Sequence, residues 1–153
     1  MGAFWGAKHA ARVMIPEKKG CILFTTSVAT NIAGLSTHPY AASKCAVLGL
    51  VRNLAAELGQ HGIRVNCVAP FAVATGIAGP KDPMQAEMME NMVTRWANLK
   101  GCVLKANDIA TAALYLASDE ASYVSGLNLV VDGGYSVVNP SMLMTISTFA
   151  ENK

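Results

Sequence analysis

Tyr40 and Lys44 stand one helical turn apart at the start of a long apolar run. Residues i and i+4 share a helix face, so a phenol and an ammonium group would be neighbours, and a nearby positive charge favours the phenolate. With the hydroxyl of Ser27 to hold a substrate oxygen, such a pair suits proton transfer to or from an alcohol or ketone. None of the three side chains accepts a hydride, so a cofactor would have to. Taken alone, the pair is a weak signal, because an aromatic residue and a surface charge at this spacing arise often by chance at helix starts.

A strand and a helix must bring these residues together. The β-prone run Cys21–Thr26 lacks the alternation of a half-exposed strand, which suits burial on both faces of a parallel sheet, and it ends at Ser27. A loop over 27–38 follows, and then a helix from about Pro39 to Gly59. In parallel α/β sheets, ligands bind beyond the carboxyl ends of the strands. The three side chains can therefore converge at that edge.

The other segments alternate between helix and strand, which is typical of an α/β domain with a parallel sheet. One domain is expected over residues 1–153, with a flexible tail over about 139–153. The further elements that the pattern predicts are an amphipathic helix before Gly20, strands over Ile63–Ala69 and Leu127–Asp132, and helices over Met84–Ala97 and Asp108–Ser118, the last capped by Asn107 or Asp108.

Composition and charge exclude several classes of protein. The net charge of +2 and the lack of a dense basic run argue against a nucleic-acid partner. The longest apolar run near the N-terminus is far shorter than a membrane span, and no early basic region precedes it, so neither a membrane association nor a signal peptide is expected. The scattered cysteines form no zinc-type spacing, so no metal site is predicted. We expect reduced, buried thiols and a cytoplasmic protein.

Three separated stretches resemble the short-chain dehydrogenase/reductase family. Ser27 with Tyr40–Lys44 resembles its active-site signature, and Gly62–Pro70 and Tyr123–Gly134 continue the likeness in the family's order. Within the family, the wording is most similar to plant alcohol dehydrogenases of the secoisolariciresinol dehydrogenase type. The resemblance implies the C-terminal part of a Rossmann-like, doubly wound parallel sheet with about three strands.

The resemblance also implies roles for the residues at the predicted edge of the sheet. Tyr40 would be the catalytic acid and base, Lys44 would stabilise its phenolate and hold the nicotinamide ribose hydroxyls, and Ser27 would orient the substrate oxygen. Tyr40 and Lys44 would thus bind the cofactor as well. That cofactor would be NAD or NADP, with NAD slightly preferred.

The segment after the second predicted strand would meet the nicotinamide. Members of the family usually carry Pro-Gly-x-Val-x-Thr there, and this chain has Phe71 in place of the glycine. By the resemblance, Pro70, Val73 and Thr75 would bind the cofactor, Val73 through its backbone. The loop Gly76–Pro83 and the helix after it would form a substrate lid whose apolar side chains favour a small, largely apolar metabolite (Ile77, Met84, Met88, Met89, Trp96).

No Gly-rich turn of the kind that binds a dinucleotide pyrophosphate is found in the sequence. The N-terminal Gly-rich βαβ part is therefore expected to be absent, and the chain to be inactive by itself if that part is needed. The leading prediction is an NAD(P)-dependent oxidoreductase, a short-chain alcohol dehydrogenase/reductase that interconverts a secondary alcohol and a ketone. By resemblance its full-length form is a homo-oligomer, a dimer or tetramer. Two alternatives remain: a non-catalytic truncated form with an oligomerisation or regulatory role, and a non-redox cyclase on the same fold.

Overall fold

The computed structural model describes residues 1–77 and 79–138, and within them three parallel strands form one sheet in the order β1-β2-β3. The α/β class with a three-stranded parallel sheet and flanking helices is therefore confirmed. The strands are β1 (Gly20–Thr25), β2 (Ile63–Pro70) and β3 (Asn128–Val131), and the helices are α1 (Gly2–Glu17), α2 (His38–Gly59), α3 (Pro83–Trp96) and α4 (Ala106–Ala117). Short 3-10 turns are η1 (Val28–Thr30), η2 (Asp119–Ala121) and η3 (Tyr135–Val137).

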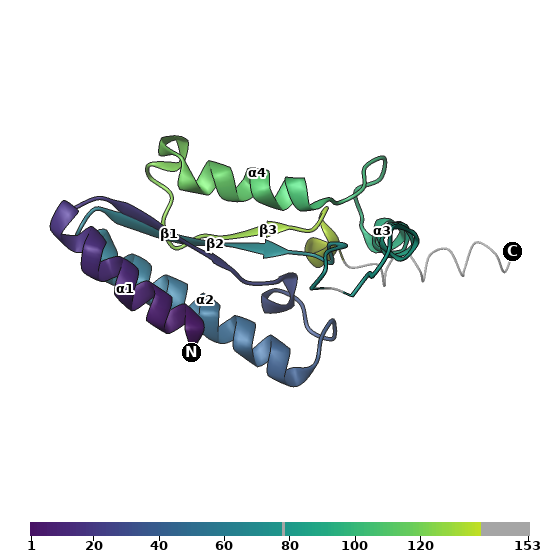
Figure 1. Ribbon diagram of the computed structural model, residues 1–153, viewed down its shortest axis with the longest axis horizontal. Coiled ribbons are helices and arrows are strands. Elements are labelled where there is room, and N and C mark those ends of the chain that lie inside the picture. Colours follow the sequence, from purple (N-terminus) through teal and green to yellow (C-terminus); the bar gives the residue numbers. More distant parts are fainter. Residues whose placement is uncertain (78, 139–153) are drawn as a thin grey trace, which may run out of the picture.

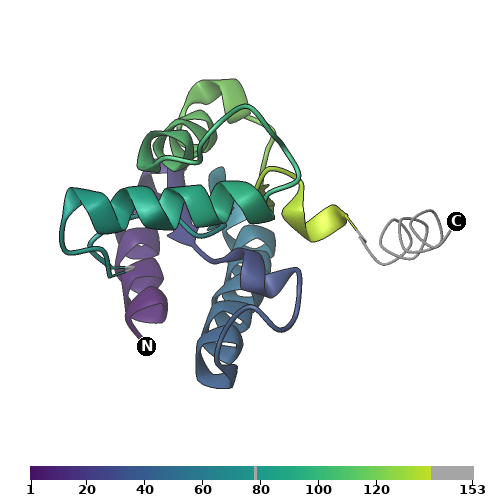
Figure 2. The same ribbon diagram turned by 90° about the vertical axis from the view of Figure 1, so that its right-hand side faces the viewer.

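The helices cover both faces of the sheet (Figure 1). Helices α1 and α2 lie side by side on one face, and α4 lies on the other. Helix α3 crosses the end of the sheet to which the strand arrows point, as Figure 2 shows from that end. Strand β2 lies between its two neighbours and is buried along almost its whole length, as is usual for the central strand of a parallel sheet covered on both faces. The carboxyl ends of the strands therefore face α3.

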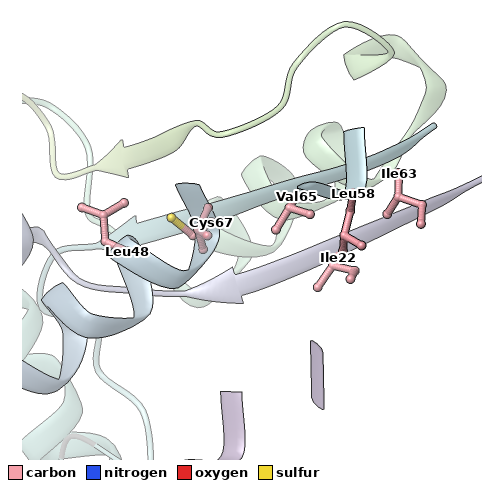
Figure 3. Packing of buried hydrophobic residues seen from close by; sticks show 7 residues of the cluster. Ile22, Leu48, Leu58, Ile63, Val65 and Cys67 are labelled. Carbon is pink, nitrogen blue, oxygen red and sulfur yellow. The ribbon is translucent and has the colours of Figure 1, made fainter. Parts of the chain in front are cut away.

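The core between α2 and the sheet fixes the direction of α2. Leu48 and Leu58 on the helix pack against Ile22, Val65 and Cys67 of the strands (Figure 3), and all five are almost wholly buried. Each fully buried aliphatic side chain contributes about 1.5–3 kcal/mol of hydrophobic free energy. Because α2 is held against the sheet from Leu48 to Leu58, its first turns project from a defined place beside the end of β1.

Most predicted elements lie within one or two residues of the observed ones, but two details were wrong. The predicted loop 27–38 contains η1, a single 3-10 turn. Helix α4 begins at Ala106 with Lys105 as its N-cap, not Asn107 or Asp108. Asp108 instead lies inside the first turn, where its carboxylate accepts a hydrogen bond from the Lys105 backbone N–H at 2.7 Å. It stabilises the helix start from within, because that N–H has no partner in the helix.

The expectation of buried cysteines holds for only one of the four. All four thiols are free, Cys67 is buried, Cys21 is half-buried, and Cys45 and Cys102 are exposed. Cys45 lies in the apolar run of α2, but on a side of the helix that the sheet does not cover. The predicted tail over 139–153 lies outside the described residues. Over residues 1–77 and 79–138, no helix has both the length and the apolar character that crossing a bilayer requires.

Candidate active site

All six predicted site residues line one cavity of about 730 Å³. The cavity lies at the carboxyl end of the sheet, where β1 runs into the loop before α2 and β2 runs into the loop before α3. Residues of three segments meet there: Ser27 after β1; Tyr40 and Lys44 in the first turns of α2; and Pro70, Val73 and Thr75 at and after the end of β2.

Ser27 is held so that its hydroxyl hydrogen is available. The residue caps η1, and its Oγ accepts a hydrogen bond from the backbone N–H of Ala29 at 3.2 Å. Its carbonyl oxygen accepts from the N–H of Thr30 at 2.9 Å. Ser27 is buried, and among the residues that the structure describes its hydroxyl meets no acceptor. The hydroxyl can therefore donate to an oxygen placed in the cavity.

Lys44 lies against both Tyr40 and the end of β1. Its Nζ lies 5.6 Å from the centroid of the Tyr40 ring and donates a hydrogen bond to the Thr25 carbonyl oxygen at 3.0 Å. An ammonium group has three donors, so this bond leaves two of them for a ligand. Tyr40 itself is 44% exposed, which leaves its phenol accessible from the cavity. The strand end thus orients the lysine, and the lysine lies beside the phenol.

The walls of the cavity are mainly apolar. Three of the predicted lid side chains, Ile77, Met89 and Trp96, line it, whereas Met84 and Met88 lie exposed away from it. Further apolar lining comes from Phe71 in the segment after β2 and from three residues that sequence reasoning did not connect with the site, namely Val28, Leu35 and Ile109. This composition favours a ligand with much apolar surface.

Phe71 forms part of the structure beneath the cavity. Its ring stacks on Tyr135 of η3 with centroids 4.5 Å apart, and it packs with Val28 and Val93. Among the described non-glycine residues only Lys18 has a positive φ, so the chain at Phe71 does not need the glycine that the family usually has. Sequence reasoning missed this stack, although a large aromatic in place of a glycine was a visible signal.

The comparisons with known proteins agree with this geometry. A short-chain alcohol dehydrogenase family model, described as enoyl-(acyl carrier protein) reductase, matches residues 1–136. (+)-Borneol dehydrogenase 1 of Salvia officinalis is 62% identical over 140 residues, which are 92% of this chain and 54% of that protein. The chain thus spans about half the length of the relatives it matches.

Two solved structures share the fold. A gluconate 5-dehydrogenase from Burkholderia cenocepacia, in complex with NADP and tartrate, superposes with a TM-score of 0.78 at 29% identity, covering 90% of this chain and 53% of that one. A 4-hydroxyisoleucine dehydrogenase complexed with NADH has a TM-score of 0.76 at 30% identity and covers 89% of this chain and 55% of its own. The chain belongs to the short-chain dehydrogenase/reductase family, whose C-terminal Rossmann portion its three strands and flanking helices match.

Proposed function

We propose that the protein is an NAD(P)-dependent oxidoreductase that interconverts a secondary alcohol and a ketone. The observation that carries the proposal is the meeting of Ser27, Tyr40 and Lys44 in one apolar cavity at the carboxyl end of a parallel sheet. The names of the relatives support it, since one is a borneol dehydrogenase and two related structures bind NADP or NADH. Because the chain covers about half of these proteins, the activity is proposed for the whole protein.

The proposed roles follow from the contacts. In the direction of reduction, Ser27 donates its free hydroxyl hydrogen to the carbonyl oxygen and holds it beside Tyr40. Tyr40 then transfers its phenolic proton to that oxygen, and the ammonium group of Lys44 stabilises the phenolate that is left. The nicotinamide, when bound, supplies the hydride to the carbonyl carbon. In the direction of oxidation Tyr40 takes the proton back.

The cavity has groups that fit a nicotinamide ribose. Lys44 keeps two ammonium donors after its bond to Thr25, and these suit the two ribose hydroxyls. Pro70, Val73 and Thr75 line the same cavity on the side of β2, where they would hold the nicotinamide ring and its carboxamide. We propose NAD as the cofactor to test first, with NADP beside it.

The proposed substrate is a small, largely apolar alcohol or ketone. The lining by Ile77, Met89, Trp96 and Ile109 offers apolar surface with few polar groups, which suits a terpenoid such as borneol or an alcohol of the kind that secoisolariciresinol dehydrogenases oxidise. The few polar groups, Ser27 and Tyr40 among them, would then select the position of the reacting oxygen.

Tyr40→Phe tests the proposal. The variant removes the proton donor and keeps the ring, so kcat for alcohol oxidation should fall by about 10²–10⁴-fold, measured by nicotinamide absorbance with borneol and related alcohols. Tyr115→Phe is the matched control, because Tyr115 is similarly exposed at 41% but lies on α4 outside the cavity. Equal losses in both variants would contradict the assignment.

Two further measurements separate the alternatives. Isothermal calorimetry with NAD and NADP measures cofactor binding, and a protein that binds neither would be a non-catalytic form. Mass spectrometry of the product distinguishes redox chemistry, which changes the mass by two hydrogens, from an isomerising cyclisation, which leaves it unchanged. A product of unchanged mass would replace the oxidoreductase proposal with the cyclase.

We also propose that the protein associates with copies of itself through the layer that α1 and α2 form. Helix α1 exposes large apolar side chains, with Phe4 at 50%, Trp5 at 46% and Val13 at 62% exposed. Burying such surface between copies would remove apolar area from water. Sedimentation velocity measures the mass of the particle, and a monomer at all concentrations would contradict the proposal.

A further inference from the structure

Asn128, the first residue of β3, has a side chain within hydrogen-bond distance of four others. Its Oδ1 lies 2.7 Å from the hydroxyl of Thr26 and 3.1 Å from the thiol of Cys67. Its Nδ2 donates to the hydroxyl of Thr30 at 3.1 Å and to the side-chain oxygen of Asn31 at 2.9 Å. Strand β2 lies between β1 and β3, so this amide reaches across the central strand to the loop after β1.

The partners of Asn128 stand on both sides of Ser27. Thr26 precedes it, and Thr30 closes the turn after it. The hydroxyl of Thr30 has one hydrogen, which it can donate to the Ser27 carbonyl oxygen at 2.7 Å while accepting from the Asn128 amide. The result is a continuous chain from the Asn128 N–H through the Thr30 hydroxyl to the Ser27 carbonyl. Bonds in such chains strengthen one another.

Among the described residues, few other hydrogen bonds hold this turn. The Ser27 hydroxyl accepts from Ala29, two residues further along the same turn, so that bond cannot fix the turn relative to the sheet. Thr26 is anchored to β2 through its N–H at 2.8 Å from the Val68 carbonyl. Beyond Thr26, the side-chain hydrogen bonds that tie the turn to the sheet, in the part of the chain that the structure describes, are those of Asn128 with Thr30 and Asn31. The buried side chain of Val28 adds apolar packing with Phe71 at the end of β2.

We propose that Asn128 is a positioning residue that fixes the Ser27 hydroxyl relative to the substrate oxygen. The proposal rests on the role of Ser27 in the proposed function. Without the amide, the turn would lose its hydrogen bonds to β3, and the packing of Val28 would remain. Ser27 would then be less firmly fixed relative to Tyr40, which stands on a different element. Because a displacement of about 1 Å at a reacting centre can cost about 100-fold in rate, Asn128 would control turnover without touching the substrate.

The first test measures the turn directly and needs no activity. In Asn128→Ala, amide hydrogen exchange at Ala29 and Thr30, whose N–H groups bond to Ser27, should accelerate about tenfold relative to core amides such as Val65. Asn66→Ala is the matched control. Asn66 is fully buried in the same sheet and bonds to Val124 and Leu127, but it does not contact the turn. Unchanged exchange at Ala29 and Thr30 in Asn128→Ala would overturn the proposal.

The second test is a double-mutant cycle on turnover. Asn128→Ala should lower kcat by about 10–100-fold with little change in KM. In a Ser27→Ala background the same substitution should have no further effect, since it acts through Ser27. The control Asn66→Ala should change kcat by the same factor in the wild-type and the Ser27→Ala backgrounds. If Asn128→Ala also lowered kcat equally in both backgrounds, the proposal would be overturned. Absence of oxidoreductase activity in the whole protein would instead refute the proposed function, while the exchange experiment would still decide whether Asn128 holds the turn.

Discussion

At the scale of single residues, Phe71 shows how a departure from the family pattern is accommodated. Its ring is buried, stacks on Tyr135 and contacts Val28, which follows Ser27 directly. An aromatic at this position therefore joins the turn after β1, the end of β2 and the turn after β3 in one apolar cluster. Phe71 in place of glycine therefore adds apolar packing under the cavity. The backbone at Phe71 has no positive φ that would favour glycine.

Restoring the glycine should accordingly destabilise the protein. We expect Phe71→Gly to lower the free energy of unfolding by about 3–5 kcal/mol, the range for removal of a buried aromatic ring, measured by urea denaturation. Tyr135→Phe keeps both rings and removes only a hydroxyl, so it should change the free energy by less than about 1 kcal/mol. If Phe71→Gly were neutral or stabilising, backbone strain at this position would have to be accepted instead.

The sequence predicted that Ser27, Tyr40 and Lys44 meet, but not which residue supports them. The three residues, which line one cavity, were singled out by their chemistry, their spacing and the family resemblance, all of which can be read from short stretches of the sequence. Asn128 was not found, because its contacts depend on the register in which Cys67 pairs with Asn128 across β2 and β3. That register is fixed by packing between segments far apart in the chain, and no local pattern encodes it.

At the scale of elements, the turn between α1 and β1 contacts the turn between α2 and β2 at the amino ends of the two strands. Gly62, between α2 and β2, has a φ of +71°, and a Cβ there would lie 2.5 Å from the carbonyl oxygen of Lys18. Lys18 ends α1 with a φ of 51°. The turn between α2 and β2 therefore touches the turn between α1 and β1, and only glycine fits the contact.

The two glycines at Gly62 and Gly49 should respond to alanine with opposite signs. Gly62→Ala should lower the free energy of unfolding by at least about 2 kcal/mol, from the cost of the left-handed conformation and the clash with Lys18. Gly49 lies inside α2, and a Cβ added there would meet no atom within 4 Å outside its own stretch of helix, so Gly49→Ala should raise the free energy by about 0.5–1 kcal/mol. Thermal unfolding of the two variants measures both changes in the free energy of unfolding. Changes of the same sign in Gly62→Ala and Gly49→Ala would contradict this account.

The existence and order of the elements could be predicted, whereas their ends depended on contacts. Strand β1 was recognisable because the β-prone run Cys21–Thr26 lacks the alternation of a half-exposed strand. The start of α4 was missed because Lys105 has no capping side chain, and Asp108 satisfies its backbone N–H from inside the helix. The 3-10 turn η1 was missed because its bonds come from Ser27 and Thr30, which read as ordinary loop residues.

At the scale of the whole molecule, the reactivity of the Cys67 thiol indicates whether the sheet is intact. It lies at the centre of β2, fully buried, with its thiol beside Asn128 of β3. Burial raises the pKa of the Cys67 thiol above its usual value of 9.0, and a hydrogen bond with Thr26 and the charge of Arg52 oppose this rise. Because only the thiolate reacts with common labels, the folded protein protects this thiol by both its burial and its protonation.

The four cysteines should therefore react in an order that follows the structure. At about pH 8 a maleimide should label Cys45 and Cys102 quickly, Cys21 more slowly, and Cys67 only when the sheet opens, so that the labelling rate of Cys67 rises with urea in step with global unfolding.

In a variant that keeps only Cys67, the free energy of unfolding should be highest below pH 9.0, the usual pKa of the thiol, and fall as the pH rises further. The reason is that the unfolded thiol ionises there while the buried one, with its raised pKa, does not. Cys67→Ala should remove this part of the pH dependence. In the labelling experiment, rapid reaction of Cys67 in the folded protein would contradict the prediction, because it would show that β2 and β3 separate without global unfolding.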